Sequence, residues 1–171
     1  MRMMVAFDIV SICALSCCGF DKKVPQNYLF LFLFTFANGW LASITCLRVN
    51  PMIVLEAALL TLAVVIGITI YATTTSSDFT YCGAYLWVAA MIFSMFSLLL
   101  YAFGIHNSLF QAVAGVILFS CYLVWDTQMI MGGDEKRAQF DEDSYILAAV
   151  SLYLDIINLF LNLLQILNDE S

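Results

Sequence analysis

The chain consists of long apolar runs separated by short polar breaks. The runs are continuous rather than alternating, as in residues 29–34 and 59–70. A strand of a membrane β-barrel alternates apolar and polar residues, whereas a membrane helix needs about 20 mostly apolar residues in a row. The pattern therefore predicts about six spanning helices, over residues 3–19, 28–47, 52–72, 82–104, 108–131 and 145–167.

The polar breaks carry the signals of helix ends. Asn50 comes directly before Pro51, which predicts a capping side chain followed by a first helical turn. Residues 73–78 and 105–107 form short polar connections, and residues 132–144 form one long hydrophilic loop. Short connections place consecutive helices antiparallel, so we expect a single membrane-embedded domain over residues 1–171.

Composition supports a membrane protein and excludes several functions. Hydrophobic residues make up 63% of the chain and charged residues only 11%, against about 25% in a typical soluble domain. The net charge of −7 comes without a basic patch, which argues against nucleic-acid binding. The six cysteines form no C-x-x-C pair, so buried core thiols are a better interpretation than a zinc site or a disulfide framework. We expect no resident cofactor.

Basic residues indicate the orientation of the bundle, because they are enriched in cytoplasmic loops. With six spans, they fall into two groups on opposite sides of the membrane: Lys22, Lys23, Lys136 and Arg137 against Arg2 and Arg48. The larger group is expected on the cytosolic side, which leaves both ends of the chain on the other side.

Four carboxylates lie inside the predicted spans, where ionisable groups are costly and usually functional. They are Asp8, Glu56, Asp126 and Asp155. Glu56 lies near the start of its helix and could simply reach the membrane interface. Asp8 has no obvious basic partner in the sequence and is a secondary candidate for the polar lining of a site.

The last predicted span carries a polar stripe. Its members follow one another at spacings that keep them on one helical face: Ser151, Asp155, Asn158, Asn162 and Gln165. Such a stripe must face the bundle interior, so we expect the last helix to be surrounded by the others. A hydrogen-bonded seam between helices would explain the amides. It explains less well a carboxylate about 15 Å from the end of the helix.

Asp126 and Asp155 are expected to meet. The two spans are consecutive, and both carboxylates lie at similar depths from the same end. Two facing carboxylates in a low dielectric cannot both be ionised, so one would hold a proton and bridge to the other. The pair would be a pH-sensitive latch and a transient oxygen site for Ca²⁺, since two carboxylates are too few for tight binding.

Enzymatic alternatives are less well supported. A serine hydrolase would need a positioned serine and histidine, and the single histidine, His106, lies in a loop. An intramembrane aspartyl protease needs two aspartates, which this chain has. Its usual Y-D and G-x-G-D signatures are missing, because Asp126 follows Trp125 and Asp155 follows Leu154. We therefore predict that the protein is not an enzyme.

Short motifs along nearly the whole chain form a family-like set. They are Asp8-Ile9-Val10, Ala14-Leu15-Ser16-Cys17-Cys18, Pro25-x-Asn27, Asp78-Phe79-Thr80, Asp126-Thr127-Gln128 and Leu152-Tyr153-Leu154-Asp155-Ile156-Ile157-Asn158-Leu159-Phe160. Together they resemble the lifeguard branch of the transmembrane Bax inhibitor motif proteins.

The resemblance implies a fold of seven helices and a protein of the endoplasmic reticulum or Golgi, with the plasma membrane as an alternative. It also implies protection against apoptosis and a pH-dependent Ca²⁺ leak. The family's aspartate pair would be Asp126 and Asp155, and its basic group would fall near Lys22 and Lys23.

The sequence departs from the family pattern in places. The family's first helix and the proline-rich cytosolic tail of this branch have no counterpart in the sequence. Two explanations stay open: an incomplete model of the gene and a genuinely shortened form of the protein. Ser76 replaces a usual lysine, and Trp125 stands where another aromatic residue is usual. Two further hypotheses stay open: a non-conducting regulator acting through membrane proteins of cell-death or calcium-release pathways, and an inert fragment whose polar seam meets lipid.

Overall fold

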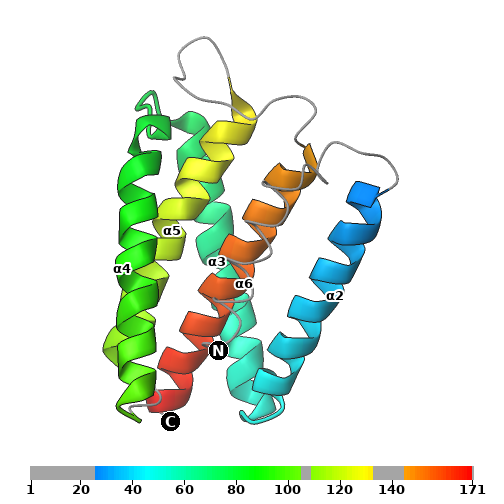
Figure 1. Ribbon diagram of the computed structural model, residues 1–171, viewed down its shortest axis with the longest axis vertical. Helices are drawn as coiled ribbons and strands as arrows, with labels where there is room; N and C mark the ends of the chain where they lie inside the picture. Colours follow the sequence, from blue (N-terminus) through cyan, green and yellow to red (C-terminus); the bar gives the residue numbers. More distant parts are fainter. Residues whose placement is uncertain (1–25, 105–108, 133–144, 171) are drawn as a thin grey trace.

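The computed structural model describes residues 26–104, 109–132 and 145–170. Within these ranges every regular element is helical (Figure 1). The elements are α2 (Gln26–Cys46), α3 (Pro51–Thr74), the short 3-10 helix η2 (Thr80–Cys82), α4 (Gly83–Ala102), α5 (Leu109–Met131) and α6 (Tyr145–Glu170). The span expected over residues 3–19 lies outside the described residues.

The helices have the length and apolarity of membrane spans. Four segments are long and apolar enough to cross a bilayer: Pro51–Thr74, Thr80–Leu100, Leu109–Met131 and Tyr145–Glu170. Helix α2 contributes a shorter apolar stretch, Leu31–Cys46. The predicted bundle of membrane helices is confirmed for the part of the chain that the structure describes.

Helix ends follow the sequence signals. The Asn50 side-chain oxygen accepts a hydrogen bond from the Met52 N–H at 3.0 Å, and Pro51 occupies the first helical turn, as predicted. Helix α5 ends at Met131, directly before Gly132, which has a positive φ of 59° and whose N–H donates to the Gln128 carbonyl at 3.1 Å. A residue without a Cβ adopts this left-handed conformation easily, which fixes where α5 stops.

Most predicted boundaries differ from the structure by one to three residues. Helix α6 ends at Glu170 rather than at residue 167, and α4 ends at Ala102 rather than at residue 104. The residues added to α6 are polar and exposed, so a hydropathy pattern could not include them. The shorter α4 stops just before Gly104, whose φ of 71° is not helical.

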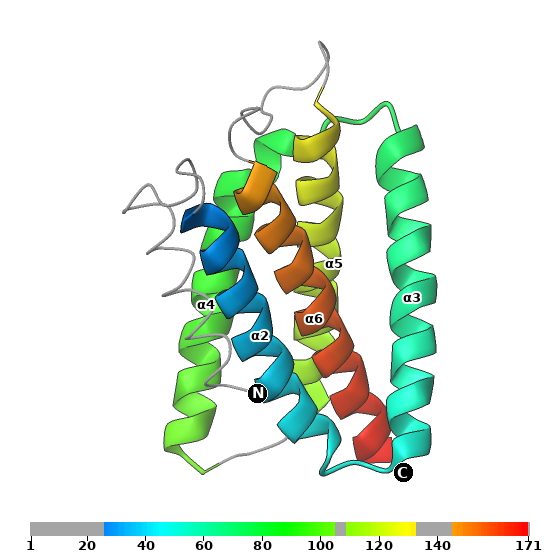
Figure 2. The ribbon, with the colours of Figure 1, turned by 90° about the vertical axis from the view of Figure 1, so that its right-hand side faces the viewer.

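Helix α6 lies at the centre of the bundle. It packs against α5, α3 and α2, while α4 packs on the far side of α5 (Figures 1 and 2). Of the most apolar window of α6, 56% is buried, against 22% for α5 and less for the other two long spans. The central position predicted from the polar stripe is therefore confirmed.

Helices α2 and α6 run side by side in the same direction (Figure 1). Three contacts set their register: the Tyr145 hydroxyl with the Tyr28 hydroxyl at 3.2 Å, the Tyr153 hydroxyl with the Thr35 carbonyl at 3.4 Å, and Ala42 with Leu161. Residue numbers rise together along both helices, as expected when three other spans lie between them in sequence. Helix α2 therefore packs against an apolar face of α6 and leaves the polar stripe to the other neighbours.

The outer faces carry exposed apolar side chains. On α2, Phe32, Phe36 and Trp40 are more than 60% exposed and stack along the helix with ring centroids 6.4 and 6.5 Å apart. An exposed apolar surface of this kind is rare on soluble monomers but suits contact with lipid. The exposed ladder and the buried polar stripe thus give the bundle an apolar outside and a polar inside.

Candidate functional site

Asp126 of α5 and Asp155 of α6 face each other inside the bundle. Their side chains are hydrogen-bonded to one another, and they are only 1% and 5% exposed. Asp126 lies in the last two turns of α5, and Asp155 lies in the first half of α6. Because the two helices are antiparallel, these positions fall at the same level. The structure brings the two expected carboxylates together.

Ser151 lies one turn before Asp155 and joins the pair. Its hydroxyl is within hydrogen-bonding reach of the Asp126 carboxyl and of the Ala148 carbonyl, at 3.1 Å from the latter. A hydroxyl has one proton, so it can donate to only one of these acceptors at a time. Ser151 can therefore donate a hydrogen bond to an ionised Asp126 or accept one from a protonated Asp126.

Each aspartate keeps one open oxygen. Asp126 Oδ1 and Asp155 Oδ2 are buried and have no hydrogen-bond partner among the described residues. Buried polar atoms are nearly always paired, because removing them from water without a partner is costly. These two oxygens are therefore places where a proton, a water molecule or a cation would bind.

Few other charged or titratable groups lie near the pair. Tyr122, on α5 one turn before Asp126, is half-buried and close enough to interact with both carboxylates. Arg48 is the single basic residue within 26–104, 109–132 and 145–170, and it is exposed in the connection from α2 to α3. The other predicted members of the site, Asp8, Lys22 and Lys23, lie outside the described residues.

The rest of the polar stripe also faces inward. Asn158 and Asn162 are each 5% exposed, and each donates to a carbonyl of its own helix, at 2.9 and 2.7 Å. The Asn162 side chain lies over Gly115 of α5, where a Cβ would collide with it. The absence of a side chain at Gly115 thus lets α5 and α6 approach closely beside the stripe.

A second polar cluster, which the sequence did not reveal, surrounds Gln128. This side chain is fully buried, and its amide donates to the carbonyls of Ala72 at 3.3 Å and Ser77 at 2.9 Å. Its oxygen accepts the N–H of Phe79 at 2.8 Å. Gln128 therefore fastens the connection between α3 and α4 to the end of α5, two residues from Asp126.

Trp125 and Asp78 complete this fastening. The Trp125 indole N–H donates to the Thr80 carbonyl at 3.1 Å, and its ring lies against Gly83. The Asp78 carboxylate accepts from the N–H and the hydroxyl of Thr80, at 2.9 and 2.6 Å. The Asp-Phe-Thr and Asp-Thr-Gln motifs were visible in sequence. Their mutual contact was not, because Gln128 binds backbone atoms, which carry no residue-type signal.

The remaining candidates do not join the pair. Glu56 is exposed on α3, so its carboxylate points away from the buried site. Among the described residues, no cluster of three or more His, Cys, Asp or Glu side chains could hold a metal ion. The aspartate pair thus offers two carboxylates and no further strong ligand from the described part of the chain.

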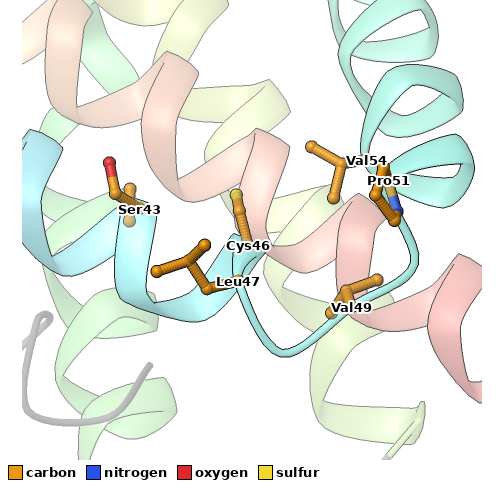
Figure 3. Close-up of a pocket in the computed structure, with 7 residues that line it drawn as sticks. Ser43, Cys46, Leu47, Val49, Pro51 and Val54 are labelled. Atoms are coloured by element: carbon orange, nitrogen blue, oxygen red, sulfur yellow. The ribbon is translucent and has the colours of Figure 1, made fainter.

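A separate open cavity of about 600 Å³ lies where α2 connects to α3 (Figure 3). Its lining is mostly apolar: Ala42, Ser43, Cys46, Leu47, Val49, Pro51 and Val54. The Ser43 hydroxyl donates a hydrogen bond to the Gly39 carbonyl of its own helix, at 2.8 Å. The cavity has no charged lining residue and does not belong to the aspartate site.

The fold and site define a class of protein: an integral membrane bundle of helices with an aspartate pair buried between its last two spans. The family described as Bax1-I, inhibitor of apoptosis-promoting Bax1, matches residues 1–171. The chain belongs to this family, which confirms the resemblance seen in the sequence motifs.

Curated relatives come from plants, animals and bacteria. Protein LIFEGUARD 2 of Arabidopsis thaliana is 38% identical, covering 86% of this chain and 62% of that protein. Protein lifeguard 3 of Homo sapiens is 30% identical, covering 97% and 55%. An uncharacterised protein of Campylobacter jejuni is 37% identical, covering 85% and 63%. The chain thus spans about 60% of the length of these relatives.

Proposed function

We propose that this protein is a passive, pH-sensitive Ca²⁺ leak of an internal membrane, the endoplasmic reticulum or Golgi, and that it protects cells against apoptosis. One observation carries the proposal: two buried carboxylates meet across α5 and α6, and each keeps an oxygen without a partner among the described residues. Membership of a family described as inhibiting an apoptosis-promoting protein supports the cytoprotective part.

The gate is the charge state of the pair. With one shared proton, Asp126 and Asp155 hold α5 and α6 together through their hydrogen bond. When that proton leaves, two carboxylates about 4 Å apart repel by about 4 kcal/mol at an effective dielectric constant of about 20. This repulsion separates the helices and admits water. Flux should therefore be low at acidic pH and should rise as the pH rises.

Groups from neighbouring elements have little charge with which to offset this repulsion. Ser151 can donate one hydrogen bond, and Tyr122 is a neutral phenol at physiological pH. Glu56, the carboxylate of α3, is exposed and points away from the pair. Within the described residues no cation accompanies the pair, which leaves a permeant cation as the natural counter-charge.

Calcium is the cation that fits these ligands. Ca²⁺ prefers oxygen atoms and binds tightly only when six to eight of them surround it. Two carboxylates with a serine hydroxyl nearby hold the ion weakly, and weak binding is what conduction needs, since the ion must also leave. The site therefore suits the passage of Ca²⁺ rather than its storage.

The test is Ca²⁺ flux from purified protein in liposomes, measured against pH. Wild-type flux should rise with pH, and Asp155→Asn should give a flux that no longer changes with pH, because the remaining carboxylate has no charged partner. Glu56→Gln, which removes an exposed carboxylate of another helix, is the matched control and should behave as the wild type. An unchanged pH profile in Asp155→Asn would remove the mechanism.

The second candidate is a non-conducting regulator that acts through partner membrane proteins of cell-death or calcium-release pathways. The description of the family, inhibitor of apoptosis-promoting Bax1, favours it because it names another protein as the target. Purified protein that gives no flux while the expressed chain still alters cell survival would support the regulator. We assign no catalytic role to the aspartates in either case, in keeping with that description.

A further inference from the structure

The open cavity at the connection between α2 and α3 lies at one end of the bundle, where the chain leaves the apolar spans. Helix α2 ends at Cys46 and α3 begins at Pro51, and from this connection the two helices diverge while both pack against α6 (Figure 2). The cavity volume of about 600 Å³ falls within the range of small-molecule sites, about 300–1,000 Å³. The divergence of two spans therefore leaves room for a small molecule at the membrane boundary.

The lining of the cavity suits a hydrocarbon chain. Ala42 and Ser43 come from the last two turns of α2, Val54 from the first turn of α3, and Leu47 and Val49 from the connection (Figure 3). Apart from Ser43, these side chains are apolar, and they extend from the connection about one helical turn into the spans. The cavity thus fits an apolar group that enters from the surrounding lipid.

Arg48 places a positive charge beside this apolar cavity. It lies between the lining residues Leu47 and Val49, its side chain is exposed, and it forms no ion pair with any residue that the structure describes. A guanidinium binds phosphate through two parallel hydrogen bonds and is the side chain best suited to that group. An apolar cavity with an unpaired guanidinium beside it matches the two ends of a phospholipid.

The other charges at this end of the bundle limit the kind of headgroup. Asp169 and Glu170 lie at the end of α6, near the start of α3, and are exposed (Figure 2). A headgroup with several negative charges would be repelled by these carboxylates, whereas a phosphate followed by an ammonium group complements both signs of charge. The charges therefore favour a zwitterionic headgroup.

We propose that this cavity binds a zwitterionic phospholipid, with one acyl chain in the cavity and the phosphate hydrogen-bonded to Arg48. The bound lipid fills the space between α2 and α3 and links the two helices at the membrane boundary. The proposal does not rest on the Ca²⁺ leak, because Asp155 lies toward the other end of α6.

The native thiol of Cys46, which lines the cavity and is half-buried, measures occupancy. In a chain whose other five cysteines are replaced by alanine, its reaction rate with a maleimide is followed in detergent. Three compounds are titrated: a phosphatidylethanolamine, the diacylglycerol with the same acyl chains, and glycerophosphoethanolamine. At about ten times its dissociation constant the phospholipid should slow the reaction about tenfold, because only the unoccupied fraction reacts. Neither the chains alone nor the headgroup alone should do so at that concentration.

Variants of Arg48 test the phosphate contact. Arg48→Gln should raise the phospholipid concentration needed for protection about fivefold, as expected for one basic residue facing an anionic lipid group, and Arg48→Lys should keep most of the protection. A chain with Cys121, exposed on α5, as its single cysteine is the matched control, and its rate should not distinguish phospholipid from diacylglycerol. Equal protection of Cys46 by these two compounds, or protection unchanged in Arg48→Gln, would overturn the proposal.

Ser43→Phe tests the cavity itself. Ser43 is exposed, so the variant should fold, and the added ring takes the space of the acyl chain. Native mass spectrometry in detergent should show one phospholipid retained on the wild type and none on Ser43→Phe. Val88→Phe, which adds a ring at an exposed position of α4, is the control and should retain the lipid. A folded Ser43→Phe that still retains the phospholipid would place it elsewhere and overturn the site.

Discussion

Two of the buried polar side chains in the last turns of α5, Gln128 and Asp126, differ in how the fold satisfies them. Gln128 has a hydrogen-bond partner for both ends of its amide, on Ala72, Ser77 and Phe79. Asp126, two residues earlier, is just as buried but keeps one oxygen without a partner in the described part of the chain. A satisfied group fastens elements together, whereas an unsatisfied one indicates where another species binds.

The two regions also differ in what they connect. Gln128 and Trp125 bind backbone atoms of the connection between α3 and α4, a contact that does not depend on pH. The aspartate pair joins α5 to α6 through titratable side chains. Substitutions should therefore separate the two: changes around Gln128 should lower stability, and changes at the pair should alter the response to pH.

The largest effect on stability is expected from Gln128→Leu. The substitution leaves two carbonyls and one N–H of the α3–α4 connection without their partner, which should lower the free energy of unfolding by about 3 kcal/mol. Unfolding of the purified protein in detergent measures this loss. Gln165→Leu, on the half-buried end of the α6 stripe, is the comparison and should lose less. Equal losses would mean that Gln128 is not a special fastening.

A smaller loss is expected from Gly115→Val. The added side chain collides with Asn162, so α5 and α6 must move apart, and such overpacking costs about 1–3 kcal/mol. No charge changes, yet the separation should weaken the hydrogen bond between the aspartates and raise Ca²⁺ flux at acidic pH. Gly39→Val is the control, since nothing lies near a Cβ at that position. If a folded Gly115→Val keeps a low flux at acidic pH, the distance between α5 and α6 does not control conduction.

Trp125→Phe should have a modest effect. The ring still fills the space beside Gly83, but the hydrogen bond to the Thr80 carbonyl is lost, at a cost of about 1 kcal/mol. The pH profile of Ca²⁺ flux should keep its midpoint, because Trp125 does not contact the carboxylates through a hydrogen bond in the structure. Thermal unfolding and flux measured on the same sample check both statements, and a shifted midpoint would contradict the separation of the two regions.

The smallest effect is expected from Glu56→Gln. The side chain is exposed on α3, and surface substitutions usually change stability by less than about 0.5 kcal/mol. Flux at every pH should match the wild type. A changed flux profile would show that a carboxylate outside the α5–α6 pair takes part in the response to pH.

Much of the fold could be predicted from the sequence, because the bilayer imposes a simple length rule. The spans, the Asn50 cap and the central place of α6 follow from apolar runs and from one polar stripe. The approach of Asp126 to Asp155 could also be predicted, since a short connection fixes two neighbouring helices as antiparallel. The 3.6-residue period of an α-helix was enough to place the residues of the polar stripe on one face.

The rest could not be predicted, for physical reasons. Gln128 binds backbone atoms, and no residue type in the α3–α4 connection reveals that partnership. Asn38 is a single amide within an apolar run, and no pattern in the sequence predicts its complete burial. The direction of Glu56 was equally hidden, because α3 is apolar on every side and has no polar stripe to orient it.

The central claim is that Asp126 and Asp155 share a proton that controls conduction. Infrared difference spectroscopy on the reconstituted protein measures this proton directly, through the carbonyl band of a protonated carboxylic acid. The band should be present at acidic pH, should disappear as the pH rises in step with increasing Ca²⁺ flux, and should change in both Asp126→Asn and Asp155→Asn. Two ionised carboxylates at the pH where flux is lowest would contradict the account.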